Sequence, residues 1–578
     1  MKPTSLVTSS EEDEIEEIIP AEIVDRATKS TNIYQLAGLE VRFPYDAYKN
    51  QKDIMTSIIN AFNGKKHAML ESPTGTGKSM SIVCGALAYL ESLKKSRPSF
   101  AADVQVNPTD SMRKRLLEKE NQEEAVKYQR GAEAQGLVSS SQEVATPQFP
   151  LIIIASRTHR QLTQLVRELK RSGYRAKYTV LASRKHYCIN SSVRDAHDPD
   201  DECKKLAKEA DATKKCPYIG NVERTCKSDR SGKYTTDMDI EELVRHGHKN
   251  NVCPYMLSKE SMDHAEIVFA PYNYIVDPSV RESMGLQIDG ALVVIDEAHN
   301  IEDVCRAAGG IELTSARLGV VQYELHTLVD GQHGDIELPK EHARIFHHVN
   351  TLQRWLQEEA DASKLSKKGS EEYGKHVLIW EGTRMIEELA SLQINSNTVR
   401  ELNMDLSSIS QRSKEPSISS QTAKDILGKK ELVNSTKKPH MSTMSILLLQ
   451  NLYRVLSDLL EFCMDPNKPG QYLSSLADFR LVRIKETLQT IRSTSNSFIF
   501  NIWCLNPAVV FRKLTSRAAC VVLTSGTLSP MDIISSELGV SFPIKQQSSH
   551  IIDENQVRRW SFLDFRGCNR PRTKRQKT

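Results

Sequence analysis

Nine consecutive residues, Glu71 to Ser79, have the composition of a loop that binds phosphate groups. Glycines at 75 and 77 let the backbone turn tightly and point its N–H groups inward. Lys78 can reach the β- and γ-phosphates, and the Ser79 hydroxyl can ligate Mg²⁺. The run departs from the usual G-x-x-x-x-G-K-[ST] pattern at its first position, which is Ser72. We predict that a nucleoside triphosphate binds at Ser72, Pro73, Thr74, Gly75, Thr76, Gly77, Lys78 and Ser79.

The run Asp296-Glu297-Ala298-His299 supplies the acidic partners that such a loop requires. Asp296 would hold Mg²⁺ directly or through water, and Glu297 would orient and deprotonate the attacking water. His299 would link the state of the nucleotide to the rest of the protein. Together with Lys78, this D-E-A-H run predicts a catalytic site that hydrolyses a nucleoside triphosphate.

Gln51 lies just upstream of the phosphate loop and is a candidate for recognising adenine. A glutamine amide can accept from the adenine amino group and donate to N7 at the same time. An ordinary polar residue on the protein surface is the alternative, and the sequence leaves both interpretations open.

Five of the eleven cysteines fall in one segment, at Cys188, Cys203, Cys216, Cys226 and Cys253. In an intracellular protein, such clustering favours a metal site over disulfides. No pair has the C-x₂-C spacing of a zinc finger, whereas four thiolates from separate loops can hold a [4Fe–4S] cluster. The spacing favours iron–sulfur over zinc, leaves the absence of a metal open, and leaves one cysteine over.

The segment Arg157 to Lys185 contains nine Lys and Arg residues and a single acidic residue, Glu168. A surface that follows the phosphates of a nucleic acid is one interpretation. The other is a solvated helix face. Because the segment begins directly after an apolar run, where open α/β sheets bind ligands, we favour nucleic acid.

Short apolar runs must position these polar segments. Ala68 to Leu70 precedes the phosphate loop, Leu151 to Ala155 precedes Arg157, and Ala291 to Ile295 precedes Asp296. Continuous apolar runs are typical of strands buried on both faces of a parallel sheet. Met80 to Leu93 follows the loop with helical spacing. The sequence therefore predicts an α/β fold built on a parallel sheet.

The rest of the chain is assigned more coarsely. Residues 99–148 are polar and are expected to form a partly disordered insertion. Helical spacing is expected at 343–358, 376–392 and 441–463, with a Ser- and Lys-rich linker at 404–440. Strands are expected at 498–505 and 520–523, the second followed by the hydroxyl-rich run Thr524 to Pro530.

Composition sets wide limits on function. The chain has 578 residues and a net charge of +3, so it should contain several domains, and nucleic-acid binding must come from local patches. Residues 1–30 carry eight acidic and three basic residues, which is unlike a secretory signal or a transit peptide. Since no apolar run approaches the ~18 residues of a membrane span, we expect a soluble intracellular protein without a membrane partner.

These motifs together resemble the iron–sulfur DNA helicases of superfamily 2, of the xeroderma pigmentosum group D type, and within them the Fanconi anaemia group J branch. The resemblance spans roughly Tyr34 to Ile551. It is carried by Phe43 to Gln51, Glu71 to Ser79, Ser156 to His159, the cysteine segment, Phe269 to Tyr274, Asp296 to Asp303 and Leu523 to Pro530.

The resemblance implies a [4Fe–4S] cluster whose ligands are Cys188, Cys203, Cys216 and Cys253, with Cys226 as the spare. It also implies a RecA-like motor domain into which a cluster domain and a helical arch are inserted. Single-stranded DNA would pass between them, threaded 5′ to 3′. Residues implied at the strand are Arg157, Thr158, Thr527 and Arg184 (the last facing DNA or the cluster), with Tyr187 or Tyr272 stacking on bases.

The domain organisation expected from the resemblance has seven parts. They are a disordered acidic tail (1–33), the motor domain in three parts (34–180, 261–305 and 496–535), the iron–sulfur domain (181–260), the arch (306–495), and a stub of a second motor domain with a basic tail (536–578).

Only 48 residues follow Pro530, whereas a second RecA-like domain needs on the order of 150. We therefore expect a C-terminally truncated member in which the second RecA-like domain is largely missing, together with the arginine that it supplies to ATP hydrolysis. The tail from Arg566 has six basic residues and no acidic one. It is interpreted as a nuclear-localisation or nucleic-acid patch, or as the end of a shortened transcript.

The expected function is an ATP-dependent 5′-to-3′ DNA helicase of nuclear DNA repair, using ATP, Mg²⁺ and the [4Fe–4S] cluster. It would act as a monomer on single-stranded and forked DNA. One alternative is a truncated form that binds ATP and single-stranded DNA without unwinding. Another is a zinc-dependent nucleic-acid adaptor whose phosphate loop is only structural.

Overall fold

The structure is a computed structural model that describes residues 32–73, 75–96, 149–196, 199–208, 215–228, 237–330, 340–358, 367–372, 375–412, 441–463, 476–489 and 494–548. The acidic tail, the insertion at 99–148, Thr74 and the basic tail therefore lie outside the described residues. In the described part of the chain, no helix has the length and apolar character needed to cross a membrane.

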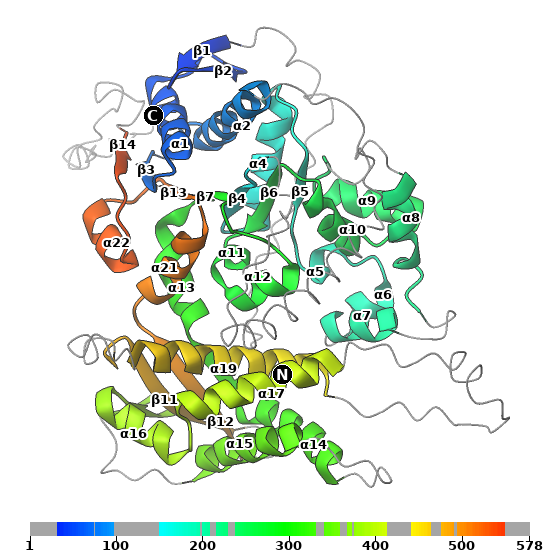
Figure 1. Ribbon diagram of the computed structural model, residues 1–578, viewed down its shortest axis with the longest axis vertical. Coiled ribbons are helices and arrows are strands. Elements are labelled where there is room, and N and C mark those ends of the chain that lie inside the picture. The colour runs from blue at the N-terminus through cyan, green and yellow to red at the C-terminus, as the bar shows by residue number, and fades with distance from the viewer. Residues whose placement is uncertain are drawn as a thin grey trace, which may run out of the picture.

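A seven-stranded parallel sheet forms the centre of the larger part of the molecule (Figure 1). Its strand order is β14-β3-β13-β7-β4-β6-β5, and each neighbouring pair runs parallel. The strands are β3 (Ala68–Glu71), β4 (Ile152–Ser156), β5 (Tyr178–Val180), β6 (Ile267–Pro271), β7 (Leu292–Asp296), β13 (Cys520–Ser525) and β14 (Ile544–Gln547). This arrangement confirms the predicted α/β class built on a parallel sheet.

Helices cover both faces of this sheet. One face packs against α1 (Lys49–Gly64), α2 (Lys78–Ser96) and α4 (His159–Arg171), and the hairpin β1 (Asn32–Leu36) and β2 (Leu39–Phe43) caps that layer. The other face packs against α11 (Asn273–Val276), α12 (Pro278–Met284), α13 (Ile301–Gly309), α21 (Ala508–Arg517) and α22 (Met531–Leu538). Burial on both faces explains why the central strands β4, β6, β7 and β13 are mainly apolar runs, whereas the edge strand β14 is polar and partly exposed.

The cysteine segment lies between β5 and β6 in sequence and folds as short helices beside that end of the sheet (Figure 1). The helices are α5 (Arg184–Tyr187), α6 (Ser191–Arg194), α7 (Pro199–Lys208), α8 (Gly220–Ser228), α9 (Ile240–Asn250) and α10 (Pro254–Glu260), followed by the 3₁₀ turn η2 (Ser261–Asp263). Their apolar residues join the core on the α13 face of the sheet.

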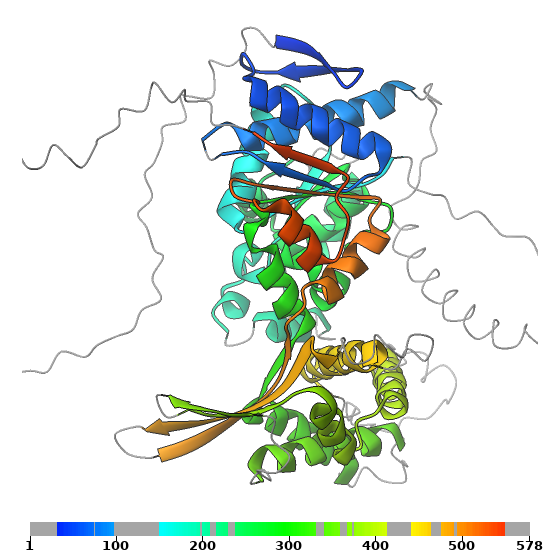
Figure 2. The same cartoon turned by 90° about the vertical axis from the view of Figure 1, so that its left-hand side faces the viewer.

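A second body, here called the inserted region (311–504), lies below the parallel sheet in Figures 1 and 2. It contains the antiparallel sheet β8-β12-β11-β10-β9 and a helical layer with its own hydrophobic core. The strands are β8 (Ile311–Thr314), β9 (Lys367–Glu372), β10 (Lys375–Trp380), β11 (Phe479–Gln489) and β12 (Thr494–Cys504). The helices are α14 (Ser315–Asp330), α15 (Lys340–Gln357), α16 (Gly382–Ser391), α17 (Ser396–Arg412) and α19 (Thr443–Cys463).

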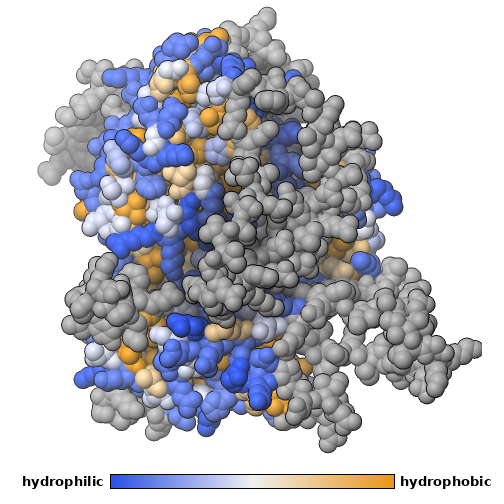
Figure 3. Space-filling view, in the orientation of Figure 1, coloured by the Kyte–Doolittle hydropathy of each residue, from blue (hydrophilic) through white to orange (hydrophobic). Residues whose placement is uncertain are grey.

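Hydrophilic residues cover much of the described surface of the inserted region that Figure 3 displays, with smaller apolar spots between them. Two polar contacts join α19 to α13 and α21, which pack on the parallel sheet. Arg454 donates to the Ala308 carbonyl at 2.9 Å, and Lys513 pairs with Asp458 at 2.5 Å.

The inserted region differs from its prediction as a mostly helical domain. The helix expected over 376–392 was wrong in its first part, because 375–380 pairs with β11 as a strand. The linker expected from Met404 was wrong as far as Arg412, since α17 continues to that residue. The strand expected at 498–505 exists within β12, but it pairs in the antiparallel sheet. The boundaries expected at 305 and 495 thus fall inside α13 and β12.

Candidate nucleotide site and cysteine region

Three neighbouring strands, β3, β13 and β7, bring the candidate nucleotide residues to one edge of the parallel sheet. The register aligns Ser525 with Glu71 and Thr524 with Asp296, so the polar residues that follow these strands meet at their carboxyl ends. A backbone hydrogen bond from the Ser72 amide to the Ser525 carbonyl, at 2.9 Å, holds the start of the phosphate loop against the end of β13. This edge is where open α/β sheets bind ligands.

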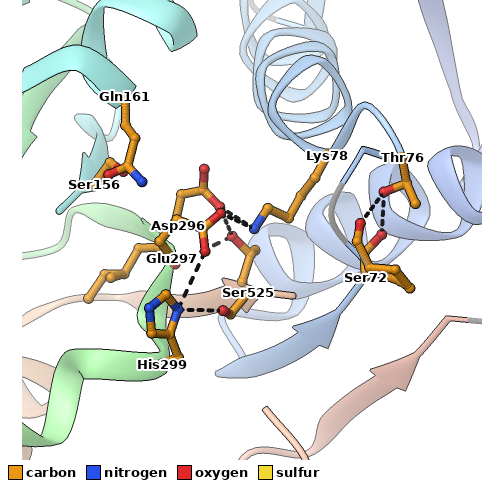
Figure 4. A network of polar contacts seen from close by, with 12 residues as sticks. Ser72, Thr76, Lys78, Ser156, Gln161, Asp296, Glu297, His299 and Ser525 are labelled. Atoms are coloured by element: carbon orange, nitrogen blue, oxygen red, sulfur yellow. Dashed lines mark hydrogen bonds and ion pairs between the residues drawn. The ribbon is translucent and has the colours of Figure 1, made fainter. Parts of the chain in front are cut away.

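Lys78 lies between the two acidic residues of the D-E-A-H run (Figure 4). Its Nζ is 3.0 Å from Asp296 Oδ1 and 2.8 Å from Glu297 Oε1. The Lys78 side chain is 8% exposed and that of Asp296 is 5% exposed, so both charges are largely removed from water. A buried lysine needs such partners, because an uncompensated buried charge is strongly destabilising. The predicted association of the phosphate-loop lysine with Asp296 and Glu297 is present in the structure.

Hydroxyl groups after β13 complete this network. Thr524 Oγ1 donates to Asp296 Oδ1 at 2.9 Å, and His299 Nδ1 lies 2.9 Å from Ser525 Oγ. His299 Nδ1 is also 3.4 Å from Glu297 Oε2. Glu297 has a left-handed backbone (φ 56°) just before the 3₁₀ turn η3 (Ala298–Asn300), and this turns its side chain toward Lys78 and His299. His299 therefore links the acidic run to the β13 loop.

The phosphate loop is shaped by its glycines and by internal hydrogen bonds. Gly75 and Gly77 both have positive φ, at 79° and 74°, which only glycine adopts without strain. The hydroxyls of Ser72 and Thr76 lie 2.8 Å apart, and Thr76 Oγ1 donates to the Pro73 carbonyl at 2.8 Å. Ser79 follows Lys78 in the first turn of α2 and is partly buried.

Gln51 contacts the phosphate loop directly. Its Nε2 donates to the Thr76 carbonyl at 2.9 Å, and its Oε1 accepts from the Tyr48 amide at 2.9 Å. The side chain is thus held by the start of α1 and by the loop, and the residue is 7% exposed. Gln51 positions the loop here, and its role in recognising adenine stays a prediction.

Three of the residues that are candidates for contacting a DNA strand lie along the same edge of the sheet. Arg157 and Thr158 follow β4 and are exposed, and Thr527 is exposed in the loop after β13. The Thr158 hydroxyl also caps α4 by accepting from the Gln161 amide at 3.3 Å. Arg157 and Tyr272 line a pocket of about 580 Å³ between β4, β6 and α13.

The other two candidates are turned inward. Arg184 pairs with Asp200 at 2.5 Å, and its guanidinium lies 4.1 Å from the centre of the Tyr255 ring, so it faces the cysteine region. The expectation that Tyr187 stacks on bases was wrong, because this residue is fully buried and its hydroxyl donates to the Val180 carbonyl.

The four predicted ligand cysteines come from separate short elements of one region. Cys188 follows α5, Cys203 lies in α7, Cys216 precedes α8, and Cys253 is the N-cap of α10. Burial raises the pKa of the Cys253 thiol to about 11, and the nearby Cys203, Cys216 and Cys188 thiols add to this shift. Among the described residues, no three His, Cys, Asp or Glu side chains adopt a metal-binding arrangement. Cys226 is partly buried in α8.

Sequence reasoning named Glu71 and Thr524 only as the first residues of two runs and gave neither of them a role of its own. Thr524 touches Asp296, and Glu71 bonds to the loop after β13. Both roles depend on β13 lying between β3 and β7, although β13 follows β7 by more than two hundred residues in the chain. The only available signal was the hydroxyl-rich run after a buried strand, which is also common in ordinary turns.

Comparison with known proteins is consistent with this site. The DEAD_2 family model matches residues 154–318. A Fanconi anemia group J protein homolog of Gallus gallus is 28% identical, over 91% of this chain and 52% of its own length. A regulator of telomere elongation helicase 1 of Rattus norvegicus is 28% identical, over 90% of this chain and 40% of its own length.

The chain thus spans about half the length of the curated relatives that it matches, or somewhat less. Among solved structures, one described as an XPD helicase covers 87% of this chain and 62% of its own chain, with 15% identity and a TM-score of 0.38.

Proposed function

We propose that this chain, which is similar to a Fanconi anemia group J protein homolog and to a regulator of telomere elongation helicase 1, is an ATP-dependent DNA helicase that moves 5′ to 3′ along single-stranded DNA. The observation that carries the proposal is the position of Lys78, within 3.0 Å of both Asp296 and Glu297 at the carboxyl edge of a parallel sheet. Forked DNA as substrate, a monomeric state and a nuclear role in DNA repair are parts of the same proposal.

The proposed hydrolysis uses charges that are already positioned. When ATP enters, Lys78 exchanges its carboxylate partners for the β- and γ-phosphate oxygens, while the loop N–H groups and the start of α2 receive the remaining charge. Glu297, released from Lys78, then accepts the proton of the attacking water. Ser79 and Asp296 would hold Mg²⁺, which screens the phosphate charges, and Thr524 orients the Asp296 carboxylate.

His299 and Ser525 would carry the nucleotide state to the candidate DNA residues. The 2.9 Å contact between them joins the acidic run to the loop that bears Thr527. Arg157, Thr158 and the pocket beside Tyr272 lie further along the same edge, where a strand can be held by its phosphates.

The test is the Lys78→Ala substitution. Loss of this one electrostatic contact should lower ATP hydrolysis by roughly 10²–10³-fold or more. Binding of a fluorescent ATP analogue, DNA-stimulated phosphate release, and unwinding of duplexes with 5′ or 3′ tails are measured on the same preparations. Lys66→Ala, an exposed lysine just before β3, is the matched control. Absence of nucleotide binding by the unmodified chain would refute the proposal.

A second candidate is a protein that binds ATP–Mg²⁺ and single-stranded DNA without unwinding. It is favoured by one observation: within the described ranges, the parallel strands all belong to one sheet, which supplies every described group around Lys78. Nucleotide and DNA binding with little DNA-stimulated hydrolysis would support this candidate. Unwinding of a 5′-tailed duplex that depends on Lys78 would exclude it.

We also propose that Cys188, Cys203, Cys216 and Cys253 hold a [4Fe–4S] cluster. The donor set supports this, because four thiols from four separate short elements lie in one region, where the Cys188 thiol donates to the Asn190 carbonyl at 3.7 Å. Asn190 adds a second contact, donating from Nδ2 to Cys216 Sγ at 3.6 Å. The cluster would join these short helices into one rigid domain beside β5 and β6.

Iron and sulfide content of anaerobically purified protein tests the cluster. Each of Cys188→Ser, Cys203→Ser, Cys216→Ser and Cys253→Ser should lose the iron and the broad visible absorbance, whereas Cys226→Ser keeps both. Colourless protein with stoichiometric zinc would contradict the proposal.

A further inference from the structure

Glu71, the last residue of β3, lies immediately before the phosphate loop and contacts the loop after β13. Its Oε2 accepts from the Leu528 amide at 2.9 Å and from Ser529 Oγ at 2.7 Å. Its Oε1 accepts from Gln547 Nε2 at 3.2 Å. One partly buried carboxylate therefore joins the ends of β3, β13 and β14.

Backbone hydrogen bonds join the same three strand ends. The Ser72 amide donates to the Ser525 carbonyl at 2.9 Å, and the Ser548 amide donates to the Glu71 carbonyl at 3.0 Å. The start of the phosphate loop therefore cannot shift without pulling on both neighbouring strand ends. Among the described residues, the Glu71 carboxylate is the side-chain acceptor of the Leu528 amide.

Leu528 is fully buried, whereas Thr527 beside it is exposed. A buried anchor next to an exposed residue fixes the direction in which the exposed side chain points. Burial raises the pKa of the Glu71 carboxyl, but the hydrogen bonds from Ser529, Leu528 and Gln547 outweigh it and hold the pKa below its usual range. The side chain thus stays a charged acceptor at neutral pH, and hydrogen bonds to charged groups are the stronger kind.

We propose that Glu71 is a positioning residue. It transmits the nucleotide-bound state of the phosphate loop to the loop Ser525 to Pro530, which is the candidate loop for binding single-stranded DNA. The inference rests on the proposed function, since it takes ATP and single-stranded DNA as the two ligands. It is separate from the His299–Ser525 contact, which reaches the same loop from β7. Movement of Ser72 and Thr76 around a phosphate would shift the β3 end, and the carboxylate would carry that shift to Leu528 and Thr527.

The experiment measures the affinity of the full chain for a fluorescent oligothymidine, with and without a non-hydrolysable ATP analogue. The ratio of the two affinities reports coupling, which a purely structural role would not change. In Glu71→Gln, an amide replaces the carboxylate with nearly the same shape. We expect the ratio to fall at least threefold toward one. Affinity for the ATP analogue alone is measured on the same variant, so that weaker nucleotide binding is distinguished from lost coupling.

Ser529→Ala removes one donor from the opposite side and should lower the ratio in the same direction by a smaller factor. Glu40→Gln, an exposed glutamate on β2, is the control and should leave the ratio unchanged. Melting temperatures of all variants without ligand identify any that fail to fold, and Ser529→Ala then decides the question.

An unchanged ratio in both Glu71→Gln and Ser529→Ala would overturn the inference. An unmodified chain that binds both ligands independently would overturn it too, while leaving ATP and DNA binding in place. A chain that binds no nucleotide would instead refute the proposed function, so the two failures are distinguishable.

Discussion

The parallel sheet and the antiparallel sheet of the inserted region divide the molecule by task. In the parallel sheet, the polar residues Asp296, Thr524 and Ser525 stand at adjacent strand ends, and the two strands that carry them, β7 and β13, are buried along their whole length. In the antiparallel sheet, polar and apolar residues are spread along long strands such as β11 and β12. The first arrangement concentrates chemistry at one edge, whereas the second builds a core.

That core is mainly aliphatic and contains a group of aromatic rings. Trp355 contacts Trp380 and Phe500 at ring-centre distances of 5.3 and 5.9 Å, and Arg483 donates to the Trp355 carbonyl at 2.6 Å. The hydrophobic cluster of the inserted region contains no described residue of the nucleotide site. We therefore expect nucleotide binding to respond to substitutions in the parallel sheet, and the stability of the inserted region to respond to substitutions in its own core.

The largest expected effect comes from a matched pair of phenylalanines, one in each sheet. Phe500 in β12 and Phe269 in β6 are both fully buried, and each meets an aromatic ring edge-on. Replacing either by alanine should cost about 3–5 kcal/mol through lost contacts and the cavity left behind. Phe500→Ala should unfold the inserted region while ATP-analogue binding persists. Phe269→Ala should weaken nucleotide binding as the parallel sheet loosens.

Hydrogen exchange resolved by segment, followed together with nucleotide titration, checks this pair. A Phe500→Ala variant that loses ATP-analogue binding at a temperature where β3 and β7 are still protected from hydrogen exchange would contradict the separate roles of the two sheets.

A smaller effect is expected from pH, at His348 on α15. Burial, helped by the neighbouring His347, lowers the pKa of His348 to about 4, and its Nδ1 lies 3.2 Å from the Tyr453 hydroxyl. The folded state thus favours the neutral ring, while the unfolded chain takes up a proton near pH 6.5. The contribution of His348 to the free energy of unfolding is complete above pH 6.5 and is lost as the pH falls toward 4. The loss between pH 7 and pH 5 is about 2 kcal/mol.

His348→Gln should remove that pH dependence from α15 and α19, even if it lowers stability at every pH. His347→Gln, at an exposed neighbour, removes only the smaller of the two causes of the lowered pKa and should keep most of the pH dependence. Hydrogen exchange of these helices at pH 7 and at pH 5, corrected for intrinsic rates, gives the comparison. Equal pH slopes in the unmodified chain and in His348→Gln would remove His348 as the cause.

The same division explains what the sequence could predict. The phosphate loop, the D-E-A-H run and the apolar strands before them are local patterns, and the parallel sheet followed from them. The neighbours of Lys78 could be named because both partners lie in short motifs. The contact between Thr524 and Asp296 could not be predicted, since it requires β13 to lie next to β7.

The inserted region depends even more on distant pairing. β8 pairs with β12 across almost the whole insertion, with Thr314 opposite Ile499. Gly374 and Gly382 flank the run 375–380, but a short apolar run between glycines does not by itself separate a strand from a helix, and its pairing with β11 decides. Packing between distant segments overrode the local pattern there, as it did for the burial of Tyr187.

The finest comparison is within the phosphate loop, between its two positive-φ glycines. An added Cβ at Gly77 would lie 2.4 Å from Gln51 Nε2, whereas at Gly75 nothing lies within 4 Å. Gly75→Ala and Gly77→Ala therefore share the backbone strain of a left-handed alanine, and only Gly77→Ala also displaces the Gln51 amide from the Thr76 carbonyl. The difference between them should be about 1 kcal/mol, the worth of one hydrogen bond, or about fivefold in ATP-analogue affinity. Gln51→Ala made in each background should abolish that difference, because the side chain that the new methyl group displaces is then gone. A fivefold difference that survives in the Gln51→Ala background would mean that the strain at Gly77, and not Gln51, shapes the loop.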